Sequence, residues 1–152
     1  MTGNAMPIVQ RILHAFSHPR PQPLPEPDAR LALGALMVRV AQSDASYRVE
    51  EIQRIDRTLA KANDIGPIDA AKMRATCERL SHAAPDTDRF AALIRETVPH
   101  DGRLDTLRAL WQVSLADGVE RPEEIAMIEA ICGALGLSGE DNAAARAAAE
   151  GA

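Results

Sequence analysis

The sequence is poor in aromatic residues, in cysteine and in long hydrophobic runs. Its 152 residues include one Trp, one Tyr, two Phe and two Cys. Two cysteines exclude a disulfide framework, and the apolar runs are far shorter than the roughly 18 residues that a membrane span requires. A net charge of −5 gives no support to a nucleic-acid surface. We therefore expect a soluble, single-domain protein with free thiols and no nucleic-acid partner.

Alanine and arginine are what the sequence has in abundance. Alanine supplies 28 residues, and arginine outnumbers lysine by 15 to 2. Both residue types favour helices, and the 46% apolar content is enough for a core. The first residues lack the basic region and long apolar run of a secretory signal. We therefore expect a helical protein in the cytoplasm.

The N-terminal region divides into a short helix and a linker. Residues 1–18 predict an amphipathic helix that either docks on the domain or contacts a protein partner or a membrane. Its apolar face consists of Ile8, Ile12, Leu13 and Phe16. Residues 19–27 carry proline at every second position, which predicts an extended linker or a proline-rich ligand. Membrane contact is expected only through the helix.

The rest of the chain shows only helical periodicity. Residues 28–140 predict a helical domain, with Asp28 as the first N-cap. Residues 141–152 predict an alanine-rich tail or helix. A capping signal at Ser138 and Asp141 marks its start. Because this last segment has no apolar stripe larger than alanine, we expect it to fray.

An internal repeat defines the predicted architecture. Residues 30–55 match residues 103–128 without a gap, at an offset of 73 positions. The matched residues include Asp44, Arg48, Glu51 and Ile55 in the first copy and Asp117, Arg121, Glu124 and Ile128 in the second. Each copy predicts a helix, an acidic corner and a second helix. The predicted fold is all-α, an orthogonal bundle of about seven helices built from two pseudo-symmetric helical hairpin repeats.

The acidic corners are the candidate site. Asp44 with Glu51, and Asp117 with Glu124, place an Asp seven residues before a Glu at a helix start. One interpretation is structural, because carboxylates stabilise helix N-termini. A second is a divalent-cation site, since hard cations prefer carboxylate oxygens, and a third is a protein-binding surface. The spacing does not fit an EF-hand, because Gly118 directly follows Asp117.

Other patterns that carry chemistry are weak. His14 with His18, and Cys77 with His82, do not provide the ligand spacing of a zinc site. The sequence contains no P-loop, no dinucleotide-binding glycine pattern and no Ser-His-Asp arrangement. Trp111 shares an apolar helical stripe and is expected in the core. We therefore predict no catalytic residues.

The second corner carries a family resemblance. The segment ALWQVSLADGVERPEEIAMIEAICGALGLS resembles the second repeat of the TerB-like family, which is named for bacterial tellurite-resistance proteins and includes the N-terminal domain of the DjlA co-chaperones. The matching residues are Ala116, Asp117, Gly118, Glu123, Glu124 and Ile125. The resemblance implies about seven helices, no catalytic activity, and a link to tellurite or to envelope and chemical stress. It also implies a divalent cation (Ca²⁺, Mg²⁺ or Zn²⁺) at Asp44, Glu51, Asp117 and Glu124.

One residue departs from the family pattern. The first corner has Ala45 where the second has Gly118, and a left-handed alanine is strained, so the first corner is expected to turn differently. That difference counts against symmetric metal binding. The signature of a J-domain is absent from the sequence, so co-chaperone activity is not implied. The predicted function is a non-enzymatic TerB-like module, and the alternative is an adaptor whose N-terminal helix docks on a partner or a membrane.

Overall fold

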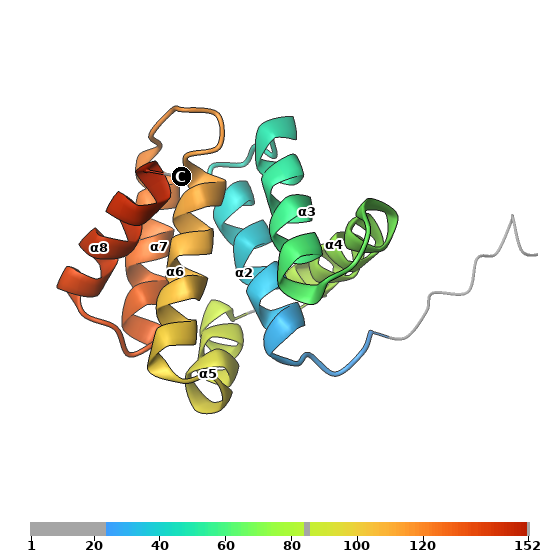
Figure 1. Cartoon of the computed structure of the whole chain (residues 1–152), viewed down its shortest axis with the longest axis horizontal. Helices are drawn as coiled ribbons and strands as arrows, with labels where there is room; N and C mark the ends of the chain where they lie inside the picture. The colour runs from blue at the N-terminus through green and yellow to red at the C-terminus, as the bar shows by residue number, and fades with distance from the viewer. Residues whose placement is uncertain (1–23, 84–85, 152) are drawn as a thin grey trace, which may run out of the picture.

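The computed structural model describes residues 24–83 and 86–151, which contain seven α-helices and no β-strand (Figure 1). The helices are α2 (Ala29–Gln42), α3 (Val49–Asn63), α4 (Pro67–Ala83), α5 (Thr87–Thr97), α6 (His100–Ser114), α7 (Pro122–Ala134) and α8 (Gly139–Glu150). The predicted all-α fold of about seven helices is confirmed. The expected helix in residues 1–18, and the linker up to residue 23, lie outside the described residues. None of the described helices has both the length and the apolar character needed to cross a bilayer.

The helix ends follow local capping chemistry. The Asp28 carboxylate accepts a hydrogen bond from the Leu31 N–H at 3.0 Å at the start of α2. Ser138 and Asp141 form a complete capping box at the start of α8. Pro122 occupies the first turn of α7, where its missing N–H costs nothing. The starts of α2 and α8 lie where the sequence predicts them.

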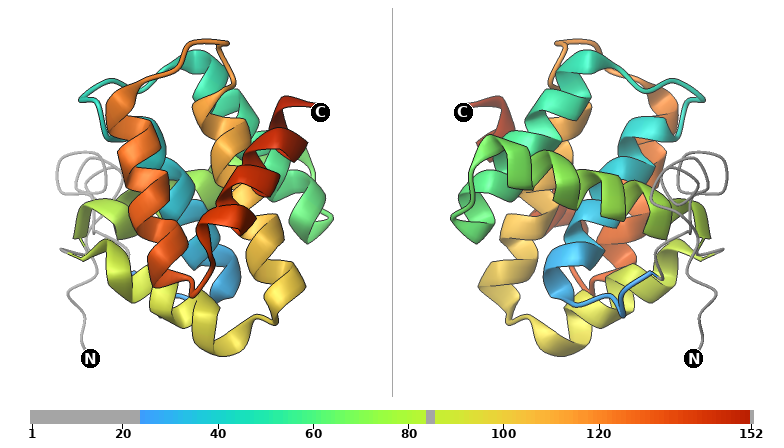
Figure 2. Two further views of the ribbon diagram at one scale, coloured as in Figure 1. Left: turned by 90° about the vertical axis from the view of Figure 1, so that its left-hand side faces the viewer. Right: turned by 90° about the vertical axis from the view of Figure 1, so that its right-hand side faces the viewer.

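Helix α2 is the centre of the bundle. It contacts α3, α4, α5, α6 and α7, and eight of its 14 residues are buried. A helix enclosed on most sides needs an almost entirely apolar surface, which explains its sequence. Gly34 lets α4 approach closely, because a Cβ at this position would lie 2.2 Å from the Cys77 Sγ. Figure 2 shows α4 crossing over α2, as expected of an orthogonal bundle. Burial raises the pKa of the Cys77 thiol to about 12, which makes it a poor nucleophile.

The two repeats are two helical hairpins. The offset of 73 residues relates α2 to α6 and α3 to α7, and it carries the first residue of α3, Val49, onto Pro122, the first residue of α7. The paired first helices, α2 and α6, contact each other in the core. Helices α4 and α5 connect the hairpins and pack against α2. Both corners therefore lie at the ends of mutually packed helices.

Helix α8 packs on α6. The expectation that this last segment frays is therefore wrong. The buried Trp111 of α6 donates a hydrogen bond from Nε1 to the Asn142 Oδ1 at 2.8 Å, and the Arg146 guanidinium lies 4.8 Å from the centre of the Trp111 rings. Ala145 and Ala149 are buried. A stripe of alanines buries little area, but its small side chains permit close packing of the backbone. This contact, added to the tryptophan bond, replaces the larger apolar stripe that the sequence lacks.

Candidate functional site

The two acidic corners turn in the same way. The Ala45 N–H donates to the Gln42 carbonyl at 3.1 Å, and the Gly118 N–H donates to the Leu115 carbonyl at 3.0 Å. Both Ala45 and Gly118 are left-handed, with φ of 65° and 77°. The expectation that Ala45 makes the first corner turn differently is therefore wrong. The cost of a left-handed alanine, about 1–2 kcal/mol, is outweighed by what the corner gains from its contacts.

The aspartate of each corner shapes the turn in which it lies. Asp44 accepts from the Ser46 N–H at 3.3 Å, and Asp117 accepts from the Val119 N–H at 3.1 Å. In both cases the carboxylate accepts a bond from the backbone two residues ahead, which is the pattern of an Asx-turn. The other oxygen of each aspartate, Oδ2, lies within 4 Å of both Arg48 and Arg121.

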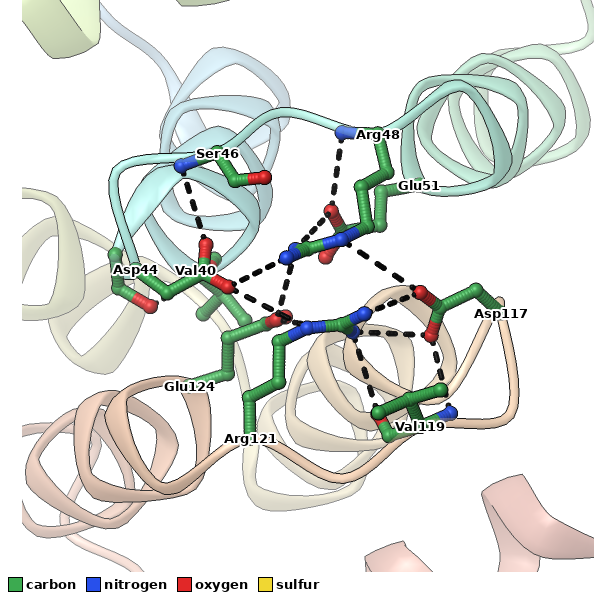
Figure 3. Close-up of polar contacts among 10 residues, drawn as sticks. Val40, Asp44, Ser46, Arg48, Glu51, Asp117, Val119, Arg121 and Glu124 are labelled. Atoms are coloured by element: carbon green, nitrogen blue, oxygen red, sulfur yellow. Dashed lines mark hydrogen bonds and ion pairs between the residues drawn. The ribbon is translucent and has the colours of Figure 1, made fainter.

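Two arginines join the corners, as Figure 3 shows. Within each corner, Arg48 Nη2 lies 2.9 Å from Asp44 Oδ2, and Arg121 Nη2 lies 2.6 Å from Asp117 Oδ2. Across the corners, Arg48 Nε lies 3.8 Å from Asp117 Oδ2, and Arg121 Nε lies 3.4 Å from Asp44 Oδ2. The hydrogen bond from the nearer arginine holds the pKa of each aspartate below its usual value. The contacts are reciprocal: each guanidinium lies within 4 Å of an aspartate in its own hairpin and of the aspartate in the other hairpin.

The glutamates lie beneath the arginines in the first turns of α3 and α7. Glu51 and Glu124 have no exposed surface, and Glu51 Oε1 accepts the Arg48 N–H at 3.2 Å. Neither carboxylate oxygen of Glu124 has a hydrogen-bond donor among the described residues; Arg121 Nη1 and Arg48 Nη1 lie 3.7 and 3.8 Å away. Burial raises the pKa of Glu124 to about 8, and the facing Glu51 and the charge of Asp44 add to this. Near neutral pH Glu124 is therefore protonated in the folded protein.

We call this group of side chains the double corner. It consists of Asp44, Arg48, Glu51, Asp117, Arg121 and Glu124. All four carboxylates that the sequence singles out meet here. The arginines were missed as site residues, although their repetition at the same offset was a signal in the sequence.

The carboxylate oxygens of the double corner are suitable ligands for a hard cation, but in this structure they contact arginine side chains. Carboxylate oxygens are the ligands that Ca²⁺ and Mg²⁺ prefer, and Zn²⁺ also accepts them. Among residues 24–83 and 86–151, however, no three Asp, Glu, His or Cys side chains are grouped so that they could hold a metal ion. The guanidinium groups of Arg48 and Arg121 take the positions between the carboxylates. A metal ion therefore fits only after the arginines move.

Comparison with known proteins places the chain in a family. The family described as Tellurite resistance protein TerB matches residues 30–147, a span that contains both corners and most of α8. No curated protein and no solved structure matches the chain. Since the match covers most of the sequence, the chain belongs to the TerB family.

Proposed function

We propose that the chain is a non-enzymatic TerB-like module whose double corner takes up a divalent cation in place of its guanidinium groups. The observation that carries the proposal is that four carboxylates from both hairpins converge on two cationic groups. A divalent ion would supply comparable charge at one point. Because it would bridge two hairpins, it would also fix their relative angle.

The accessibility of the carboxylates supports exchange with solvent. The Asp44 and Asp117 side chains are 10% and 13% exposed, so an ion can reach them from outside. Glu124 lies behind them, and neither of its carboxylate oxygens accepts a hydrogen bond from a described residue.

Calorimetric titration of the full chain with Ca²⁺, Mg²⁺ and Zn²⁺ tests the cation. Wild type should give a saturable heat of binding, of either sign, with at least one ion, and the Asp44→Ala/Asp117→Ala variant should lose that heat because two ligands are gone. The matched control, Asp69→Ala/Asp88→Ala, removes two acids from the first turns of α4 and α5 and should bind like wild type.

Removing the arginines provides the opposite test. Arg48→Gln/Arg121→Gln leaves the carboxylates in place without their cationic competitors, so the ion should bind more tightly and raise the melting temperature more than in wild type. Identical titrations of wild type and the Asp44→Ala/Asp117→Ala variant would overturn the proposal. So would a folded arginine variant whose melting temperature no cation changes.

We propose tellurite or envelope stress as the biological setting, because the family description names tellurite resistance. A strain without the gene should grow more poorly on tellurite or under envelope stress. Wild type should restore growth, and the Asp44→Ala/Asp117→Ala variant should not. Equal growth with and without the gene under both stresses would contradict this setting. The adaptor alternative depends on residues 1–18, which lie outside the described residues, and it stays a prediction.

A further inference from the structure

A groove of about 540 Å³ runs between α3 and α6. Figure 1 shows these two helices on either side of α2, and Leu33 of α2 and Ala109 of α6 give the groove apolar lining. Its charged residues are Arg54, Arg57 and Lys61 from α3, and Asp105 and Arg108 from α6. We call it the basic groove, because it gathers four cations and one anion in a chain of net charge −5.

The cations on the α3 side of the basic groove lack acidic partners within the described part of the chain. Asp105 pairs with Arg108 of its own helix, at 3.7 Å. Among the residues that the structure describes, Arg54, Arg57 and Lys61 have no carboxylate within ion-pair distance. Three positive charges therefore lie next to one another on α3 without compensation.

Arg54 is the one of these three cations whose hydrogen-bonding capacity is least satisfied. Its Nε is buried and has no hydrogen-bond acceptor among the described residues. Burial, reinforced by the charge of Arg57, lowers the pKa of Arg54. A buried donor without an acceptor costs free energy in the unliganded protein. An anionic ligand in the groove would remove that cost.

The internal repeat shows that the fold does not need these charges. The positions in α7 that correspond to Arg54, Arg57 and Lys61 are neutral in the second repeat. They are Met127, Ala130 and Ala134. The same helical hairpin is therefore built without the cations, which points to a ligand rather than to the fold as their purpose.

The spacing of the cations indicates the shape of the ligand. Arg54, Arg57 and Lys61 are three and four residues apart, so they form a row about 10 Å long on one face of α3. A row fits an elongated ligand with several separate negative charges better than a single phosphate. None of the residues that line the groove is aromatic, whereas single-stranded nucleic acids are held by stacking on aromatic rings.

We propose that the basic groove binds an acidic, partly apolar peptide segment of a partner protein. The carboxylates of the segment pair with the cation row on α3, and its apolar side chains contact Leu33 and Ala109. This surface is distinct from the double corner, so the proposal does not depend on a bound cation.

Fluorescence anisotropy with the full chain tests the proposal. The probe is a labelled synthetic peptide that alternates leucine with pairs of glutamates, and the reference peptide has glutamine in place of each glutamate. The acidic peptide should bind, more weakly as salt rises, and the glutamine peptide should not. Arg54→Gln/Arg57→Gln/Lys61→Gln should weaken binding at least about tenfold, because it removes the whole cation row.

A matched variant separates the groove from general charge. Lys72→Gln/Arg89→Gln/Arg95→Gln also removes three positive charges, from exposed positions on α4 and α5, and should bind like wild type. Thermal melting establishes that both variants are folded. Equal losses in the two variants, or equal binding of the two peptides, would overturn the proposal. Displacement of the peptide by a single-stranded oligonucleotide at lower concentration than by unlabelled peptide would also overturn it.

Discussion

The double corner and the basic groove use arginine in opposite ways. In the double corner, Arg48 and Arg121 each lie within 4 Å of carboxylates from both hairpins. In the basic groove, Arg54 and Arg57 have no carboxylate partner among the described residues. The same side chain therefore joins two halves of the fold in one region and is left available in the other. The two regions therefore differ in how their arginines are paired rather than in whether arginine is present.

The largest expected effect is the pH dependence of the double corner. Glu124 has a pKa of about 8 in the folded protein and an ordinary value of 4.5, so the folded state holds its proton more tightly. The stability that this provides is complete below the ordinary pKa and is lost as pH rises through the folded value. We expect the free energy of unfolding to fall by about 4 kcal/mol between about pH 5 and pH 8.5.

Urea denaturation at each pH measures this change. Glu124→Gln is the control, because glutamine does not titrate and the decline should largely disappear. Parallel profiles of wild type and Glu124→Gln would contradict the assignment.

A smaller effect is expected from removing one cation of the double corner. Arg121→Gln leaves Asp44, Asp117 and Glu124 without one of their shared partners. We expect the free energy of unfolding to fall by about 2 kcal/mol at neutral pH, since charged hydrogen-bond acceptors are left partly buried. Arg57→Gln in the basic groove is the control and should change stability little. If the two variants were equally stable, the comparison between the two regions would fail.

The two corners differ at the left-handed position, which is Ala45 in the first and Gly118 in the second. Exchanging these residue types should change the free energy of unfolding by an intermediate amount. Gly118→Ala should lower the free energy of unfolding by about 1 kcal/mol, and Ala45→Gly should raise it by about 0.5 kcal/mol. No atom lies within 4 Å of a Cβ at Gly118, so the cost is conformational. Gly133→Ala, at a helical glycine that also has free space, should instead stabilise. Thermal melting of the three variants checks these signs.

The smallest effect is expected in the basic groove. Arg57→Glu replaces a repulsive neighbour of Lys61 and Arg54 with an attractive one on the same helix face. We expect the free energy of unfolding to rise by about 0.3 kcal/mol, while binding of the acidic peptide is lost. Denaturation and anisotropy on the same sample check both outcomes. A loss of stability would mean that Arg57 contributes to the fold, and the contrast with Arg121 would weaken.

The features predicted best from the sequence are those that local chemistry decides. Asp28 caps α2, and Ser138 with Asp141 caps α8, because side-chain acceptors act within one turn of helix. The repeat offset also predicted that α2 and α6 are equivalent helices, and that the carboxylates of the two corners occupy equivalent places. These inferences need no knowledge of how distant segments pack.

The features that the sequence did not predict depend on contacts between distant segments. The role of Arg48 emerges only when Asp117, 69 residues further along the chain, lies beside it. Ala45 adopts a strained turn because the corner it belongs to is held by those same contacts. The basic groove combines lining from three helices, and α8 is secured by one tryptophan rather than by a stripe of its own.

The position of Trp111 has a practical consequence. It is the only tryptophan in the chain, and it lies in the contact between α6 and α8, 1% exposed, with its indole N–H bonded to Asn142. The intrinsic fluorescence of the protein therefore reports on one contact alone. If the final helix detaches, water reaches the indole and the emission moves to longer wavelength, so docking of α8 can be followed without a label.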